Sequence, residues 1–131
     1  MAITSAICNS FKVEILTATH NFTASSGNTF NLALYTSSAT LNKSTTAYTT
    51  SNEVATATGY TAKGKALTSV TPVLSSDTAV CDFANVSWTS ASFTARGCLI
   101  FNDTATGDPA VCAIDFGGDK TVTSGTFTIE F

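Results

Sequence analysis

Charged side chains are scarce in this sequence. Asp, Glu, Lys and Arg make up only 11% of the 131 residues, against roughly a quarter in an ordinary globular domain. The formal net charge is −3, and the few lysines are scattered between Lys12 and Lys120. Because this spacing leaves no basic stripe to follow a phosphate backbone, we expect no direct binding to nucleic acid.

Long hydrophobic runs are also missing. The longest apolar stretches contain a few residues, whereas a helix needs about 20 to span a bilayer. The N-terminal sequence MAITSAICNSFKVE has no basic start followed by an apolar core, as a signal peptide would. We therefore expect no membrane segment and no secretion.

Residues typical of active sites are few. His20 is the single histidine, and no G-x-S-x-G motif accompanies it, although nucleophilic catalysis needs a base beside the nucleophile. Asp103, Asp108 and Asp119 fall at turn signals, where aspartate is expected for backbone reasons. We predict no catalytic residues and a protein that is not an enzyme.

The cysteines do not form a metal-binding pattern. Cys8, Cys81, Cys98 and Cys112 include no C-x-x-C pair and match no usual zinc spacing. The last three lie inside apolar strand patterns, where a thiol behaves as a small hydrophobic group. We expect buried, reduced thiols, no bound metal ion and no cofactor.

Hydroxyl side chains take the place of charge. The sequence contains 25 Thr and 15 Ser, together nearly a third of the chain, and threonine favours strands. A neutral, hydroxyl-rich surface of this kind suits close packing of many copies in an assembly. A threonine-rich codon or habitat bias would leave the same composition.

Short apolar segments alternate with turn signals from residue 28 onward. The predicted strands are 29–36, 64–74, 78–83, 86–95, 97–102, 110–116 and 126–131, with turns at 75–77, 107–109 and 117–119. This number of strands predicts a mainly-β, single domain over residues 1–131, folded as an antiparallel β-sandwich or barrel. Strands 97–102 and 110–116 are apolar on both faces and should form a central hairpin.

The N-terminal segment shows two competing periodicities. Ile7, Phe11 and Ile15 recur at helical spacing, although residues 11–15 also alternate as a strand would. We favour a short helix over residues 6–18, because its charged residues are better helix formers than strand formers. Exposed apolar residues of this helix, Ile7 and Phe11, are candidates for an interface.

Residues 37–62 contain no convincing strand or long helix. Loops of this length inside a small domain are usually functional or disordered. Tyr48 and Tyr60 lie in this excursion, and tyrosine is favoured at interfaces. We predict an interface through these tyrosines, or else a solvated excursion that contains one short strand or helical turn.

Arg96 is the single arginine and lies beside the apolar run GCLIF. A guanidinium stays charged at every accessible pH, so it must pair with a carboxylate or point outward at a strand end. Asp115, on the strand expected to pair with the one after Arg96, and Asp82 are the candidate partners. A structural ion pair is the main prediction, and an inter-subunit salt bridge is the alternative.

Five stretches carry a resemblance to known proteins. They are ICNSFKVEIL (7–16), FNLALYTSSATLNKSTTAYTTSNEV (30–54), GYTAKGKALT (59–68), DFANVSWTSASFTARGCLIFND (82–103) and AVCAIDFGGDKTVTSGTFTIEF (110–131). Together they resemble a family of small virion structural proteins of tailed, notably marine, bacteriophages. The resemblance implies an all-β particle component, and it favours a cement or decoration protein on the head. Arg96 belongs to the pattern, but the resemblance assigns it no role.

The expected function is therefore non-enzymatic. The expected partners are the major capsid protein and copies of the chain itself, as a dimer or trimer. The resemblance implies assembly in the host cytoplasm and a final location on the phage head. A tail adaptor, tail tube or fibre subunit is an alternative, as is a host-surface glycan-binding module that uses residues 37–62. Trp88 lies in an alternating strand, where packing in the core is expected rather than stacking on a sugar.

Overall fold

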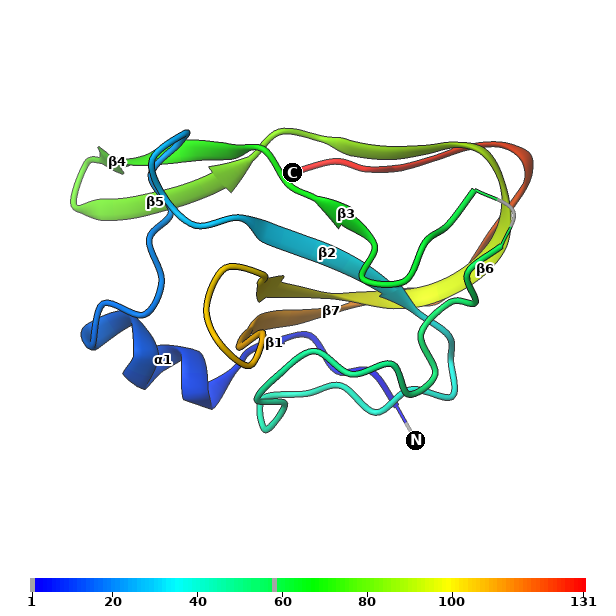
Figure 1. Cartoon of the computed structure of the whole chain (residues 1–131), viewed down its shortest axis with the longest axis horizontal. Coiled ribbons are helices and arrows are strands. Elements are labelled where there is room, and N and C mark those ends of the chain that lie inside the picture. The colour runs from blue at the N-terminus through cyan, green and yellow to red at the C-terminus, as the bar shows by residue number, and fades with distance from the viewer. Residues whose placement is uncertain (1, 58) are drawn as a thin grey trace.

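The computed structural model describes residues 2–57 and 59–131, and nearly half of them form antiparallel strands (Figure 1). The elements are β1 (Ala6–Ile7), α1 (Asn9–Leu16), β2 (Phe30–Tyr35), β3 (Lys65–Ala66), β4 (Ser69–Ser75), β5 (Thr78–Phe83), β6 (Val86–Asn102) and β7 (Ala110–Ile129). The predicted mainly-β class with a short N-terminal helix is confirmed. Met1 in the predicted domain and Thr58 in the predicted excursion lie outside the described residues.

One long hairpin, β6–β7, forms the centre of the fold. The main sheet has the order β1-β7-β6-β2-β3, so the hairpin predicted from residues 97–102 and 110–116 is indeed central. The predicted turn at 117–119 is wrong, because β7 continues through it. Ala95 pairs with Lys120 and Gly97 with Asp115, so β7 holds surplus residues at this point. The glycines therefore form a bulge in a continuous strand.

The hairpin bends back on itself. Figure 1 shows it curving round at one end of the molecule, so that its open half (86–95 and 120–129) lies over its turn half (97–102 and 110–115). The pairing shifts in register on both sides of Ala91, and such bulges bend strands. Folding one ribbon over produces two layers. The sheet is not closed into a barrel, because its edge strands β1 and β3 do not pair with each other.

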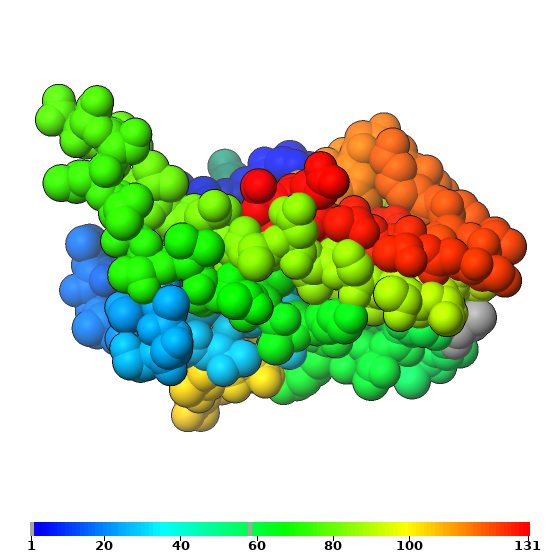
Figure 2. All heavy atoms as spheres, turned by 90° about the horizontal axis from the view of Figure 1, so that it is seen from above, coloured from blue at the N-terminus to red at the C-terminus, as the bar shows by residue number. Residues whose placement is uncertain are grey.

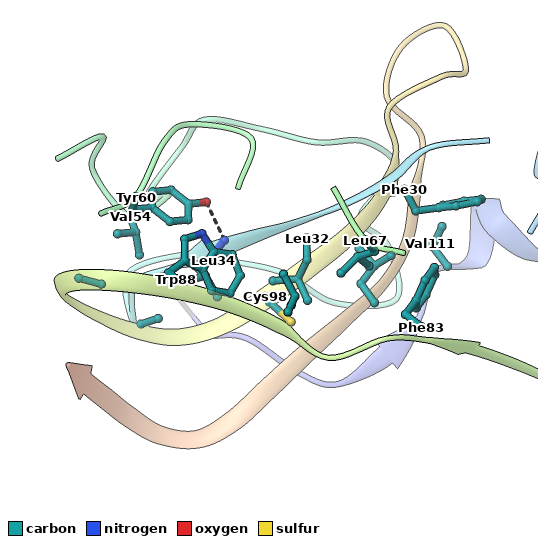
Figure 3. Close-up of a cluster of buried hydrophobic side chains, with 14 residues drawn as sticks. Phe30, Leu32, Leu34, Val54, Tyr60, Leu67, Phe83, Trp88, Cys98 and Val111 are labelled. Atoms are coloured by element: carbon teal, nitrogen blue, oxygen red, sulfur yellow. Dashed lines mark hydrogen bonds between the residues drawn. The ribbon is translucent and has the colours of Figure 1, made fainter. Parts of the chain in front are cut away.

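The space between the two halves is the first core. Alternate residues of β2, Phe30, Leu32 and Leu34, point into it and meet Trp88 and Cys98 of β6 (Figure 3). Each of these side chains is at most 2% exposed. Burial of apolar surface at this density contributes the main favourable energy of folding.

The opposite face of the same strands forms a second core. The intervening residues of β2, Ala33 and Tyr35, are buried there with Leu99 and Phe101 of β6. Ile3 and other residues from the N-terminal segment and the 37–62 excursion cover this face. Because both faces are covered here, β2 and residues 97–102 of β6 are buried throughout.

Helix α1 is shorter than the predicted 6–18. Ala6 and Ile7 form β1 instead, paired with Ala113 and Cys112 of β7. At the other end, Ala18 has φ 60°, a left-handed conformation that ends a helix. The first two residues of the predicted helix therefore form an edge strand of the sheet instead.

Strands β4 and β5 form a separate two-stranded sheet, which we call the arm (69–83). Figure 2 shows the arm projecting from one end of the body. Its root is tied down, because Ala24 N donates a hydrogen bond to Thr71 Oγ1 at 3.0 Å. Beyond the root, nearly all arm residues are exposed.

Candidate interaction surface

Arg96 forms an ion pair with Asp115, one of its two predicted partners. Arg96 Nε lies 2.8 Å from Asp115 Oδ1, and the side chains are 35% and 25% exposed. The pair joins β6 to β7 beside the Gly117 bulge, whose N–H also donates to Asp115 Oδ1. Asp82, the other predicted partner, lies in β5, where its Oδ1 accepts a hydrogen bond from Phe83 N.

We expect Arg96→Ala to have a small effect on stability, because the pair is partly exposed and solvent screens it. The Arg96 guanidinium holds the pKa of Asp115 below its ordinary value of 3.8, so this pKa should rise in the variant. Since folding lowers the pKa, the pair stabilises the fold above pH 3.8 and the contribution is lost at lower pH. Carboxyl NMR titration measures the pKa and denaturant melts measure the stability.

Lys120→Ala is the matched control, because it removes an exposed positive charge from β7. It should leave the pKa of Asp115 near its wild-type value. A large loss of stability in Arg96→Ala would contradict the prediction. A variant that melts normally but no longer assembles would support the inter-subunit alternative for Arg96.

The two tyrosines predicted at an interface are engaged within the chain. Tyr60 is only 2% exposed, and its hydroxyl accepts a hydrogen bond from Leu34 N at 2.8 Å (Figure 3). Tyr48 is half-buried and stacks on Phe101, with ring centroids 4.8 Å apart. Tyr60 is therefore not available to a partner. Its hydroxyl bonds the backbone N–H of Leu34, which lies beyond the part of β2 that pairs with β3.

Glu53 joins both tyrosines. Its Oε2 accepts from Tyr48 Oη at 2.6 Å, and its Oε1 accepts from Tyr60 Oη at 2.7 Å and from Lys63 N at 2.8 Å. Burial and the bond to Glu53 raise the pKa of Tyr48 to about 12. Glu53 thus anchors the excursion, whose described residues contribute Ala39, Leu41 and Tyr48 to the second core and Val54 and Tyr60 to the first.

His20 lies in a buried polar cluster after α1. Its Nε2 lies 3.3 Å from Glu14 Oε1, and its Nδ1 lies 3.1 Å from Asn102 Nδ2. The amide nitrogen donates, so the pattern requires the tautomer with its proton on Nε2. Asn102 Oδ1 accepts from Thr104 N and Ala105 N. The imidazole therefore holds the loop after α1 to the β6–β7 turn.

The exposed apolar surface is concentrated elsewhere, on the arm. Leu74 is 75% exposed and Val73 is 62% exposed, with Val70 and Val80 also accessible. Neighbouring residues of a strand point to opposite faces, so Val73 and Leu74 leave both faces of the arm apolar. Such exposure makes the arm a candidate interaction surface.

A groove lies beside the root of the arm. It has a volume of about 490 Å³ and is lined almost entirely by apolar atoms. Ile7 and Phe11, the other predicted interface residues, line it together with Phe83 and Phe131. Ile7 is 49% exposed. The arm and the groove together form the candidate interaction surface.

The sequence predicts the two strands of the arm but does not show that they form an exposed surface. Residues 69–83 alternate apolar residues around the turn at 75–77, and this pattern predicts core strands. Pro72 was the available signal, because proline lacks the N–H needed in a central ladder and is confined to edges. The same misreading placed Cys81 in the core, whereas it is exposed on the arm.

The four cysteines are free thiols in very different environments. Cys98 is fully buried, and burial raises its pKa; burial raises the pKa of Cys112 to about 12. In dilute solution, Cys81 should be alkylated quickly and Cys98 only after unfolding, as mass spectrometry can follow. Cys81→Ser should remove the fast phase, and fewer than four thiols in denaturant would contradict free cysteines.

Among residues 2–57 and 59–131, no group of three or more His, Cys, Asp or Glu side chains is placed to hold a metal ion. In the same part of the chain, no helix is both long and apolar enough to cross a membrane. No protein-family model, curated protein or solved structure matches this chain.

Proposed function

We propose that the protein is a non-enzymatic component of a tailed-phage particle, a cement or decoration protein bound to the major capsid protein and to copies of itself. The observation that carries the proposal is the apolar arm and groove, which a domain that worked alone would not expose. The resemblance to virion structural proteins along almost the whole chain supports the same class.

Low charge suits this role. Neighbouring copies on a shell that carried a large like charge would repel each other, whereas a net charge of −3 on a hydroxyl-rich surface permits close approach. A lattice also supplies avidity, since a copy held at two or three points dissociates far more slowly than one held at a single point. A modest apolar interface is then enough to reinforce a shell.

Densitometry of purified phage particles tests the proposal. A copy number comparable with that of the major capsid protein is expected for a cement or decoration protein. A copy number far lower would favour the tail adaptor, tail tube or fibre alternative. Absence of the protein from the particle would overturn the structural function.

The glycan-binding alternative has less support. Trp88, the single tryptophan, is 2% exposed in the first core, so it offers no stacking platform to a sugar. The excursion that would recognise the glycan is anchored by Glu53 to Tyr48 and Tyr60. A glycan array should give no specific hit, and a reproducible hit would favour the binding module.

A further inference from the structure

The arm lacks the packing that a hairpin of its kind requires. A two-stranded hairpin is at best marginally stable in water, and it needs further strands or a packed face. The arm pairs only β4 with β5, and its outer part exposes Val73 and Leu74 on opposite faces. We therefore expect another apolar surface to pack against the arm.

The groove offers an apolar surface of the same character. Its lining comes from β1, α1, the loop after α1, β4, β5, β6, β7 and Phe131, and Asp82 is the only acidic or basic residue in that lining. Between Ser69 and Cys81 the arm likewise carries a single carboxylate, Asp77, at its turn. Two nearly uncharged surfaces can pack together without stranding a buried charge.

We propose that the arm of one copy lies in the groove of a second copy of this chain. Self-association is part of the proposed function, so this inference rests on that function and names the surface. Pro72, Val80 and Cys81 belong both to the arm and to the groove lining. Because the two surfaces are contiguous, a symmetry-related copy covers both in one closed interface, which leaves no apolar surface to start a fibre.

The extent of the surface also fits a second copy. Of the nine large apolar side chains exposed in the described residues, seven lie on the arm or line the groove: Ile7, Ile15, Val70, Val73, Leu74, Val80 and Phe131. At roughly 100 Å² of apolar area for each whole side chain, their exposed fractions amount to on the order of 350 Å² per copy. One partner contributes roughly 800 Å² to a stable interface, a little over half of it apolar, so these side chains supply most of the apolar part.

The first test is the oligomeric state of the purified chain, measured by sedimentation velocity across a range of concentrations. We expect a dimer or trimer in the wild type. Leu74→Lys on the arm should weaken self-association by about 100-fold, because it removes a buried leucine and inserts a charge. Leu16→Lys is the matched control: Leu16 is 87% exposed on α1 and does not line the groove, so this variant should associate normally.

The second test mixes two defective variants. Leu74→Lys has a defective arm and an intact groove, whereas Ile7→Lys has an intact arm and a defective groove. Each should be monomeric alone, and their mixture should associate again, because one intact arm meets one intact groove. Circular dichroism checks that both are folded, and Ile15→Lys, on α1, replaces Ile7→Lys if the latter is not.

The outcomes separate this inference from the proposed function. A wild-type chain that stays monomeric, an oligomer that Leu74→Lys leaves intact, or a folded pair of variants that does not associate on mixing would each overturn the arm-in-groove contact. A monomer that nevertheless occurs in phage particles at high copy number would retain the proposed function and assign the arm to the capsid protein. A monomer that purifies with a bound lipid would likewise overturn the contact.

Discussion

Gly64→Ala should destabilise the domain by about 2–5 kcal/mol, the sum of a left-handed backbone and an overpacked contact. Gly64 has φ +67°, and a Cβ at this position would overlap the carbonyl oxygen of Leu32 in β2. The chain needs this close approach because Gly64 immediately precedes β3, whose Lys65 pairs with Leu32. Denaturant-induced unfolding measures the loss.

Two other glycines separate the two causes. Gly107 has φ +86° but has nothing within 4 Å of its virtual Cβ, so Gly107→Ala should cost only the backbone term of about 1–2 kcal/mol. Gly118 has open space and no positive φ, so Gly118→Ala should be close to neutral. Equal losses at Gly64 and Gly107 would show that the contact with β2 does not matter.

Glu53→Ala should destabilise the domain by about 3 kcal/mol, because it strands three donors in a partly buried layer. Those donors are the hydroxyls of Tyr48 and Tyr60 and the backbone N–H of Lys63. In this variant the Tyr60 hydroxyl can still accept a hydrogen bond from Leu34 N, but it has lost the acceptor of its own proton. Thermal or denaturant melts give the change in free energy of unfolding.

Glu130→Ala is the matched control, because Glu130 is an exposed glutamate near the end of the chain. It should change stability by less than about 0.5 kcal/mol. Hydrogen exchange adds a local readout: the amide of Leu34 should exchange faster in Glu53→Ala than in Glu130→Ala. Unchanged exchange at Leu34 would contradict the role of Glu53 in anchoring the excursion.

Local patterns in the sequence determined the class of fold and its centre. The doubly apolar segments GCLIF and AVCAI predicted a buried hairpin because a strand that is apolar on both faces must be covered on both. The predicted pairing of those strands also made Asp115 one of the two candidate partners of Arg96. These features depend on residues that are adjacent in the chain or in the hairpin, and periodicity reports such neighbours directly.

Only the tertiary structure decided which layer covers which face. Alternation of apolar residues identifies a face but not its partner, so Tyr60 was assigned to an interface although it closes the edge of β2. The same ambiguity placed Cys81 in the core, although the arm that carries it exposes both of its faces. Gly117 illustrates a second limit: glycine permits a positive φ in a turn or in a bulge alike, and only the pairing of β6 with β7 selects the bulge. Contacts between segments distant in the chain make these choices, because the free energy of each strand depends on what finally packs against it.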